Sequence, residues 1–177
     1  DSMVYWVTTY KFNNRIVSAF LRRPLPENGE RTEVPETTVV EATRAKLTAE
    51  LAKSSAEERL KLGQTETRPL EERYVFLWEA RQLAAEKADC ALALAASDAL
   101  ASAFEIDSAV ITLETLQQLR KHCLTSEANR DLTLAALRQA ELTARDRPEF
   151  VLPLTELAFA AARKCDAELV RRATIQL

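Results

Sequence analysis

Residue types that commonly do chemistry are scarce in this chain, which holds one histidine, three cysteines and two glycines in 177 residues. The most suggestive arrangement is His122 beside Cys123, a base next to a nucleophile. Neighbouring side chains on a helix point about 100° apart, and the sequence offers no third residue to orient the histidine. We therefore interpret His122 as a surface or helix-capping residue and expect no catalytic residue in the chain.

The three cysteines form no pattern typical of a disulfide framework or a metal site. Cys90, Cys123 and Cys165 are an odd, widely spaced set without a C-x-x-C pair. Each lies near a predicted helix end among apolar residues, so we expect small buried hydrophobic side chains. Gly29 and Gly63 are isolated, whereas a phosphate-binding loop needs a glycine-rich run. The sequence predicts no cofactor and no metal.

Paired carboxylates recur along the chain, as at Glu57-Glu58 and Glu71-Glu72. Sequence neighbours on a helix do not converge on one substrate, so we interpret these pairs as helix-capping and solubilising residues. One alternative stays open, in which carboxylates from several helices build an enzyme site or bind a metal or a small ligand.

The charge and hydropathy of the chain argue against two classes of partner. The formal net charge is −3, and acidic and basic residues are interspersed, so the sequence shows no basic patch that would bind nucleic acid. Apolar stretches are shorter than the roughly 18–20 residues that a membrane span needs. The first residues lack the long apolar core and cleavage site of a signal peptide.

The first 34 residues differ from the rest and are predicted to form an N-terminal aromatic segment and linker. Two runs rich in aromatic and β-branched residues flank Asn13-Asn14, which predicts a short β-hairpin, with a helical segment as the alternative. Residues 3–23 are too short to bury their own aromatic side chains, so we expect them to dock on the helices or contact another chain. The candidate partner-binding residues of this segment are Tyr5, Trp6, Tyr10 and Phe12.

Residues 35–177 are predicted to form an all-α domain of seven or eight antiparallel helices. Apolar residues recur at three- and four-residue steps, with Val39 and Val110 among those expected to face inward. Capping residues and first-turn prolines place the predicted helix starts at Pro35, Ser55, Pro69, Asp89, Asp107, Glu127, Pro148 and Asp166.

The predicted core of this domain is built from large apolar residues of these helices. Trp78 has two interpretations, as a core residue or as a residue of a partner-binding groove, and it joins the candidate partner-binding residues. The residues expected to be mostly buried are Leu77, Trp78, Leu100, Phe104, Leu116, Phe150 and Leu157.

Helix pairs recur at a regular spacing, with predicted starts at Pro69, Asp107 and Pro148 that lie 38 and 41 residues apart. The stretch from Ala88 to Asp107 resembles the second helix of a tetratricopeptide repeat (TPR), although alanine stands at the family's glycine positions. The steps also exceed that family's period of about 34 residues. We therefore interpret the domain as TPR-like: stacked antiparallel helix pairs of an α-solenoid or a helical bundle.

A second resemblance covers residues 69–173. Residues 71–84, EERYVFLWEARQLA, are similar to the R-Y-x-L-L-x-E-A-R-x-L-A signature of an α-helical module in large bacterial proteins, many exported and of planctomycete type. Residues 101–107 match its A-x-x-F-x-[VI]-D segment, and residues 161–166, AARKCD, resemble its A-A-R-K-x-x-D segment with one residue fewer before the aspartate. The resemblance implies a non-catalytic accessory or scaffolding domain of the cell envelope or an exported protein; without it, a cytoplasmic protein is expected.

These observations predict a non-catalytic structural or protein-interaction scaffold. Stacked helix pairs would present a groove to a protein partner or to a second copy of the chain. The identity of the partner is not encoded in any motif that we find.

Overall fold

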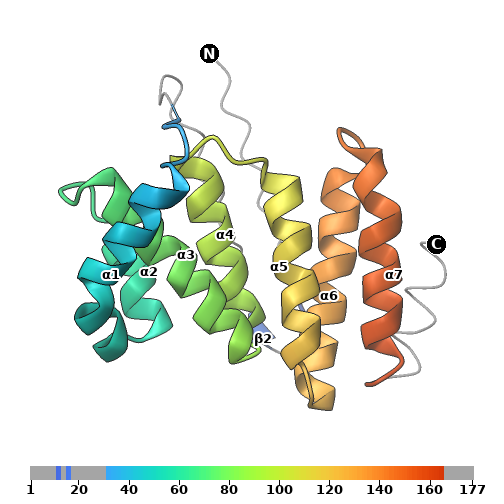
Figure 1. Ribbon diagram of the computed structural model, residues 1–177. Helices are drawn as coiled ribbons and strands as arrows, with labels where there is room; N and C mark the ends of the chain where they lie inside the picture. The colour runs from blue at the N-terminus through green and yellow to red at the C-terminus, as the bar shows by residue number, and fades with distance from the viewer. Residues whose placement is uncertain (1–10, 13–14, 17–30, 166–177) are drawn as a thin grey trace. The chain divides into compact units, whose positions relative to one another are not determined.

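The computed structural model describes residues 11–12, 15–16 and 31–165 (Figure 1). The chain divides into two compact units, Asp1–Glu30 and Arg31–Leu177, which are considered separately. In the first unit, β1 (Lys11–Phe12) pairs antiparallel with β2 (Arg15–Ile16), with Lys11 opposite Ile16. This pairing agrees with the predicted hairpin, whose turn residues lie outside the described part of the chain. Tyr5, Trp6 and Tyr10 also lie outside it.

The second unit is all-α, as predicted. Its described residues form seven α-helices and one short 3₁₀ helix: α1 (Thr37–Lys53), α2 (Ala56–Gly63), α3 (Leu70–Glu86), α4 (Cys90–Ala103), α5 (Ser108–His122), α6 (Ser126–Thr143), η1 (Pro148–Phe150) and α7 (Val151–Ala162). The predicted cap Asp166 lies beyond the described residues.

The helices of the second unit pack in two layers. One layer contains α1, α3, α5 and α7, in which each helix contacts the next, and the other contains α2, α4 and α6. Helices consecutive in the chain pack across the layers from α2 onward, and α4, α5, α6 and α7 alternate in direction (Figure 1). Short connections enforce this alternation, because a chain that turns back within a few residues must run antiparallel.

Side-chain caps fix several helix starts where the sequence predicts them. The hydroxyl of Ser55 accepts from the Glu58 amide at 3.2 Å, and the Glu58 carboxylate accepts from the Ser55 amide at 2.7 Å, which is a complete capping box. Asp89 accepts from the Leu92 amide, and Asp107 accepts from two amides of α5. These predicted starts are confirmed.

The proline starts are less accurate. α1 begins at Thr37 with Glu36 as its N-cap, so Pro35 lies before the helix rather than in its first turn. Pro69 is the N-cap of α3 and not a first-turn residue. A proline fixes its own φ and lacks an amide hydrogen, both of which suit either side of a helix start, so its position alone does not set the boundary.

Two small residues allow close approach or a sharp turn. A methyl group at Gly63, the last residue of α2, would lie 2.5 Å from Leu77 Cγ, so only glycine lets α2 sit this close to α3. Ala88 ends α3 with φ of 57°, in the left-handed region that glycine usually occupies. The amides of Ala88 and Asp89 bond back to the carbonyls of Ala85 and Ala84, which closes a Schellman motif without glycine.

Most of the predicted core is buried. Leu77, Leu100, Phe104, Leu116 and Leu157 are buried, which confirms their prediction. Val39 and Val110 are exposed, so their predicted inward orientation is wrong.

Trp78 and Phe150 are partly buried and pack against the core clusters, so they lie at the edge of the core rather than at its centre. Each ring also stacks against an arginine, Arg81 for Trp78 and Arg147 for Phe150.

Residues 31–34 belong with the helices. Thr32 forms a bridge with Phe104, its amide donating to the Ala103 carbonyl at 3.2 Å and its carbonyl accepting from the Glu105 amide at 2.8 Å. The backbone just before α1 is thereby fixed to the end of α4.

Candidate functional site

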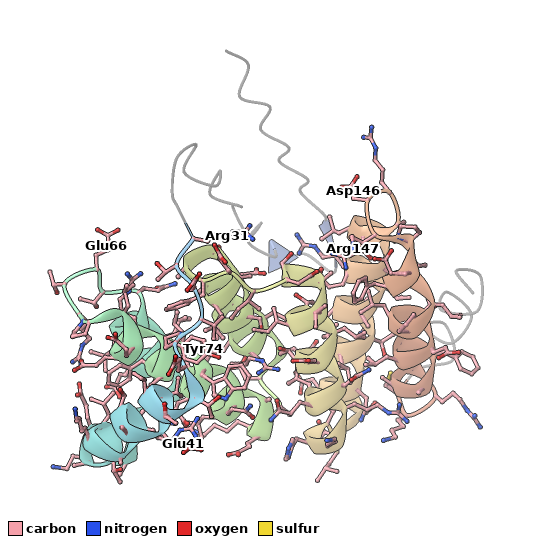
Figure 2. All side chains as sticks on the ribbon, turned by 45° about the horizontal axis from the view of Figure 1, so that its top comes forward. Arg31, Glu41, Glu66, Tyr74, Asp146 and Arg147 are labelled. Atoms are coloured by element: carbon pink, nitrogen blue, oxygen red, sulfur yellow. The ribbon has the colours of Figure 1, made fainter. Side chains whose placement is uncertain are left out.

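Three side chains on one face of α3 lead from the core to the surface. Tyr74, Trp78 and Arg81 are spaced by four and three residues, so they lie on the same side of the helix. Tyr74 packs edge-on against Phe104 with ring centroids 5.1 Å apart, and it stacks on Trp78 at 6.0 Å. The Arg81 guanidinium lies over Trp78, 4.7 Å from the ring centroid. Figure 2 shows Tyr74 among the packed helices.

Arg81 is a buried cation, with 3% of its side chain exposed. Burial lowers the pKa of its guanidinium, because the charged form loses hydration that nearby groups only partly replace. Arginine remains charged at physiological pH even so. A buried charge must be paired or hydrogen-bonded to be tolerated, so the partners of Arg81 determine what the residue can do.

A hydroxyl network holds one edge of the Arg81 guanidinium. Nε donates to Thr115 Oγ1 at 2.6 Å, and Thr115 Oγ1 lies 2.8 Å from Ser97 Oγ. These hydroxyls can also donate to the backbone carbonyls of Ile111 and Ala93, at 2.7 and 2.9 Å. The network joins α3, α4 and α5, and it orients Arg81 without supplying any negative charge.

The other edge of Arg81 is incompletely satisfied. Its nearest carboxylate belongs to Glu114, whose Oε2 lies 3.7 Å from Nη2 and whose side chain is 56% exposed. That separation is too long for a hydrogen bond. Nη1 is buried and has no hydrogen-bond partner among the described residues. Arg81 therefore retains unused donors for a carboxylate or another acceptor.

Arg81 also contributes to the lining of an open pocket of about 420 Å³, which we call the α3–α5 pocket. All of its lining comes from α3 and α5, so it lies along the layer formed by the odd-numbered helices. Gln82 and Gln118 hydrogen-bond to each other across the two helices. The lining residues are Trp78, Arg81, Gln82, Glu114, Gln117, Gln118, Lys121 and His122.

The lining is rich in hydrogen-bonding groups and carries two permanent cations against one carboxylate. Lys121 and His122 come from the last turn of α5, where basic residues also complement the helix dipole. The described lining contains no thiol or hydroxyl group.

The structure places the sequence candidates as follows. Trp78 lines the α3–α5 pocket, and its role in binding a partner stays a prediction. His122 also lines the pocket, while the adjacent Cys123 is buried in the core. Phe12 belongs to β1 in the other unit.

Two cysteines that are distant in sequence interact in the fold. Cys90 is the first residue of α4 and Cys123 caps the end of α5, and both thiols are buried in one apolar cluster. Their hydrogen bond, together with burial, raises the pKa of the Cys90 thiol. Cys165 is partly exposed. The expected apolar environment is confirmed for Cys90 and Cys123, but the contact between them is not evident from their spacing.

Two further searches of the described residues bear on the open alternatives. Within that part of the chain, no three histidine, cysteine or acidic side chains are grouped so that they could hold a metal ion. None of the helices described has the length and apolar character needed to cross a membrane.

Sequence reasoning missed Arg81, Thr115 and Ser97. The available signal was the spacing of Tyr74, Trp78 and Arg81, which places two aromatic rings and a cation on one helix face. No protein-family model, curated protein or solved structure matches the chain.

Proposed function

We propose that the chain is a non-catalytic interaction module that docks a protein partner in the α3–α5 pocket. The observation that supports this proposal is the pocket itself, an open hollow between two neighbouring helices of one layer, bordered by a half-buried tryptophan. Tryptophan and arginine are the residue types most enriched at energetically dominant positions of protein interfaces. In Trp78 and Arg81 the pocket presents one of each, already stacked and held by a buried hydroxyl network.

The stacked aromatic base makes the pocket suitable for binding because little ordering is required. Tyr74 is buried, packs edge-on against buried Phe104 and stacks on Trp78. The Trp78 ring therefore has few orientations to lose when a partner docks. Preorganisation of this kind reduces the entropy cost of association. The TPR-like and bacterial scaffold interpretation is part of the same proposal and predicts docking on a surface of stacked helices.

Site-specific photo-crosslinking tests the proposed function. A photoreactive amino acid replaces Gln117, an exposed residue of the pocket, and in a matched variant it replaces Ser102, an exposed residue of α4 outside it. Crosslinking in the cells of origin, followed by mass spectrometry, should give a partner from position 117 and not from position 102. Light scattering of the purified chain distinguishes a second copy from a different protein. A partner captured equally from both positions, or from neither, contradicts the proposal.

A further inference from the structure

We infer that the α3–α5 pocket recognises an acidic side chain, a glutamate or aspartate of an extended segment in the docked partner. This inference rests on the proposed function and specifies the chemistry of the partner. Its basis is the incomplete pairing of Arg81, which is buried, carries an unpartnered Nη1, and has no carboxylate within hydrogen-bond distance.

The geometry favours a carboxylate over a neutral acceptor. A guanidinium presents parallel N–H groups that match the two oxygens of a carboxylate, and such charge-assisted hydrogen bonds are stronger than neutral ones. In Arg81 the Nε edge is occupied by Thr115, whereas the Nη1 and Nη2 groups lack a close acceptor. A carboxylate that reaches Nη2, the group that Glu114 approaches at 3.7 Å, would pair the guanidinium and neutralise a charge that burial now disfavours.

The other polar and charged residues of the pocket also favour a carboxylate ligand. Lys121 adds a second cation to the lining, and the amide groups of Gln117 and Gln118 supply further donors. Glu114 is the one lining carboxylate, and its exposed side chain approaches Arg81 without reaching it. Glu114 therefore behaves as a weak internal competitor that an incoming acidic side chain displaces.

The pocket fits a side chain better than it fits a large ligand. Its volume of about 420 Å³ is near the lower end of the range for small-molecule pockets, and it is open to solvent. Trp78 covers one face of the Arg81 guanidinium, so an acceptor must approach in the plane of the guanidinium, from the edge. An extended segment can present one carboxylate in this way while its backbone meets the glutamines of the rim.

Fluorescence anisotropy with four labelled peptides tests this inference on the full chain. Three are ten-residue peptides with amidated C-termini, of alternating glutamate and alanine, glutamine and alanine, or lysine and alanine. We expect the glutamate peptide to bind about tenfold or more tighter than the glutamine peptide, because a hydrogen bond to a charged group is stronger than a neutral one. A glutamine peptide with a free C-terminus tests whether a terminal carboxylate can substitute; binding as tight as that of the glutamate peptide overturns the assignment to an acidic side chain.

The decisive variant is Glu114→Gln, which removes the internal competitor from an exposed position and should tighten binding of the glutamate peptide about threefold or more. Its matched control is Glu156→Gln on the exposed surface of α7, which should change nothing. Lys121→Gln should weaken binding more at low salt than at high salt, since charge attraction is screened, whereas Lys46→Gln on α1 should not. Arg81→Gln should abolish the preference for glutamate, with circular dichroism as a check of folding.

The inference is overturned if the glutamate and glutamine peptides bind equally, if neither binds, or if Glu114→Gln weakens the glutamate complex. The crosslinking experiment separates these outcomes from failure of the proposed function. A partner that crosslinks at position 117 through a neutral or basic segment keeps the docking proposal and removes the acidic specificity.

Discussion

Arg68 and Arg81 each place a guanidinium over an aromatic ring of α3, yet their surroundings differ. Arg68 lies 4.8 Å from the Phe76 ring centroid and bonds to Glu50 at 2.6 Å and to Glu72 at 3.1 Å. Arg81 lies over Trp78, and its nearest carboxylate, Glu114, is 3.7 Å away. The hydrogen bond to Glu50 raises the pKa of Arg68, whereas burial lowers the pKa of Arg81.

The difference shows that an arginine stacked on an aromatic ring can join two helices or can keep donors available for a ligand. The carboxylates of Glu50 and Glu72 join α1 and α3 through Arg68, so no donor facing them is left for a ligand. The acceptor that Arg81 bonds to is the Thr115 hydroxyl, itself bonded to Ser97, which orients the guanidinium but leaves its charge uncompensated. Such a buried charge is costly to stability, and proteins commonly keep costly groups where function requires them.

The largest expected effects come from two buried rings: Phe76, over which Arg68 lies, and Phe104, which packs against Tyr74 of the Tyr74–Trp78 stack. Phe104→Ala and Phe76→Ala each empty a fully buried position, so each should lower the unfolding free energy by about 3–5 kcal/mol. Urea denaturation measures both losses. Only Phe104→Ala should also change the emission of Trp78, recorded in a Trp6→Phe background, because Phe104 supports the Tyr74–Trp78 stack. A loss below about 1 kcal/mol would show that the ring is not enclosed.

Replacing each arginine by methionine should lower the unfolding free energy at position 68 but not at position 81. Arg68→Met leaves Glu50 and Glu72 without their shared partner at a partly exposed site, which should cost about 0.5–1 kcal/mol. Arg81→Met removes a poorly compensated buried charge, so the unfolding free energy should stay unchanged or rise by up to about 2 kcal/mol. The hydroxyls of Thr115 and Ser97 keep their backbone acceptors in this variant.

Denaturation of both methionine variants at low and high salt completes this measurement. The cost of Arg68→Met should shrink in high salt, because charge pairs near the surface are screened. A loss above about 1 kcal/mol for Arg81→Met would mean that Arg81 is a structural residue like Arg68.

How far the sequence predicts this molecule depends on the range of the interactions involved. The caps at Ser55, Asp89 and Asp107 depend on residues within one helical turn, and the sequence places all three correctly. The all-α class follows from apolar periodicity for the same reason. The left-handed turn at Ala88 was missed, because alanine gives no signal for a conformation usually taken by glycine.

The candidate site could not be predicted in full because it depends on contacts between helices. Thr115 and Ser97 are 34 and 16 positions beyond Arg81 in sequence, and nothing local marks them as its neighbours. Trp78 was recognised as a groove candidate from its aromatic context alone. Whether it is buried depends on how α5 packs beside α3, which periodicity does not determine.

Alkaline pH should lower the unfolding free energy through Tyr74, which belongs to the stack of Tyr74, Trp78 and Arg81. Burial raises the pKa of this phenol above its ordinary value near 10.0, because the phenolate would lose hydration. The stability from keeping Tyr74 neutral is therefore complete below that value and is lost as pH rises through the pKa of the folded state. Urea denaturation at pH 8 and near pH 11 should show a steeper loss for the native chain than for Tyr74→Phe. Equal losses would mean that the phenol is not desolvated.

The smallest expected effect concerns a third stacked arginine, Arg147, which lies over Phe150 in the connection before α7 (Figure 2). It bonds to Asp107 at 2.7 Å and to Glu149 at 2.6 Å, so it resembles Arg68 in pairing but its side chain is more exposed, 40% against 25%. The hydrogen bond from Arg147 holds the pKa of Asp107 below its usual 3.8, and the cap contacts with α5 act in the same direction.

A group with a lowered pKa contributes stability above its ordinary pKa and loses that contribution as pH falls through the pKa of the folded state. Asp107→Asn keeps a capping oxygen but removes the charge, so it should cost less than Arg68→Met at neutral pH. The difference between the native chain and Asp107→Asn should vanish as pH falls from 5 toward about 2, and it should also shrink in high salt. Thermal unfolding across this pH range measures the effect. Asp146→Asn, an exposed position next to Arg147, serves as the control. A loss as large as that of the buried rings would mean that exposed pairing of an arginine is as important as its burial.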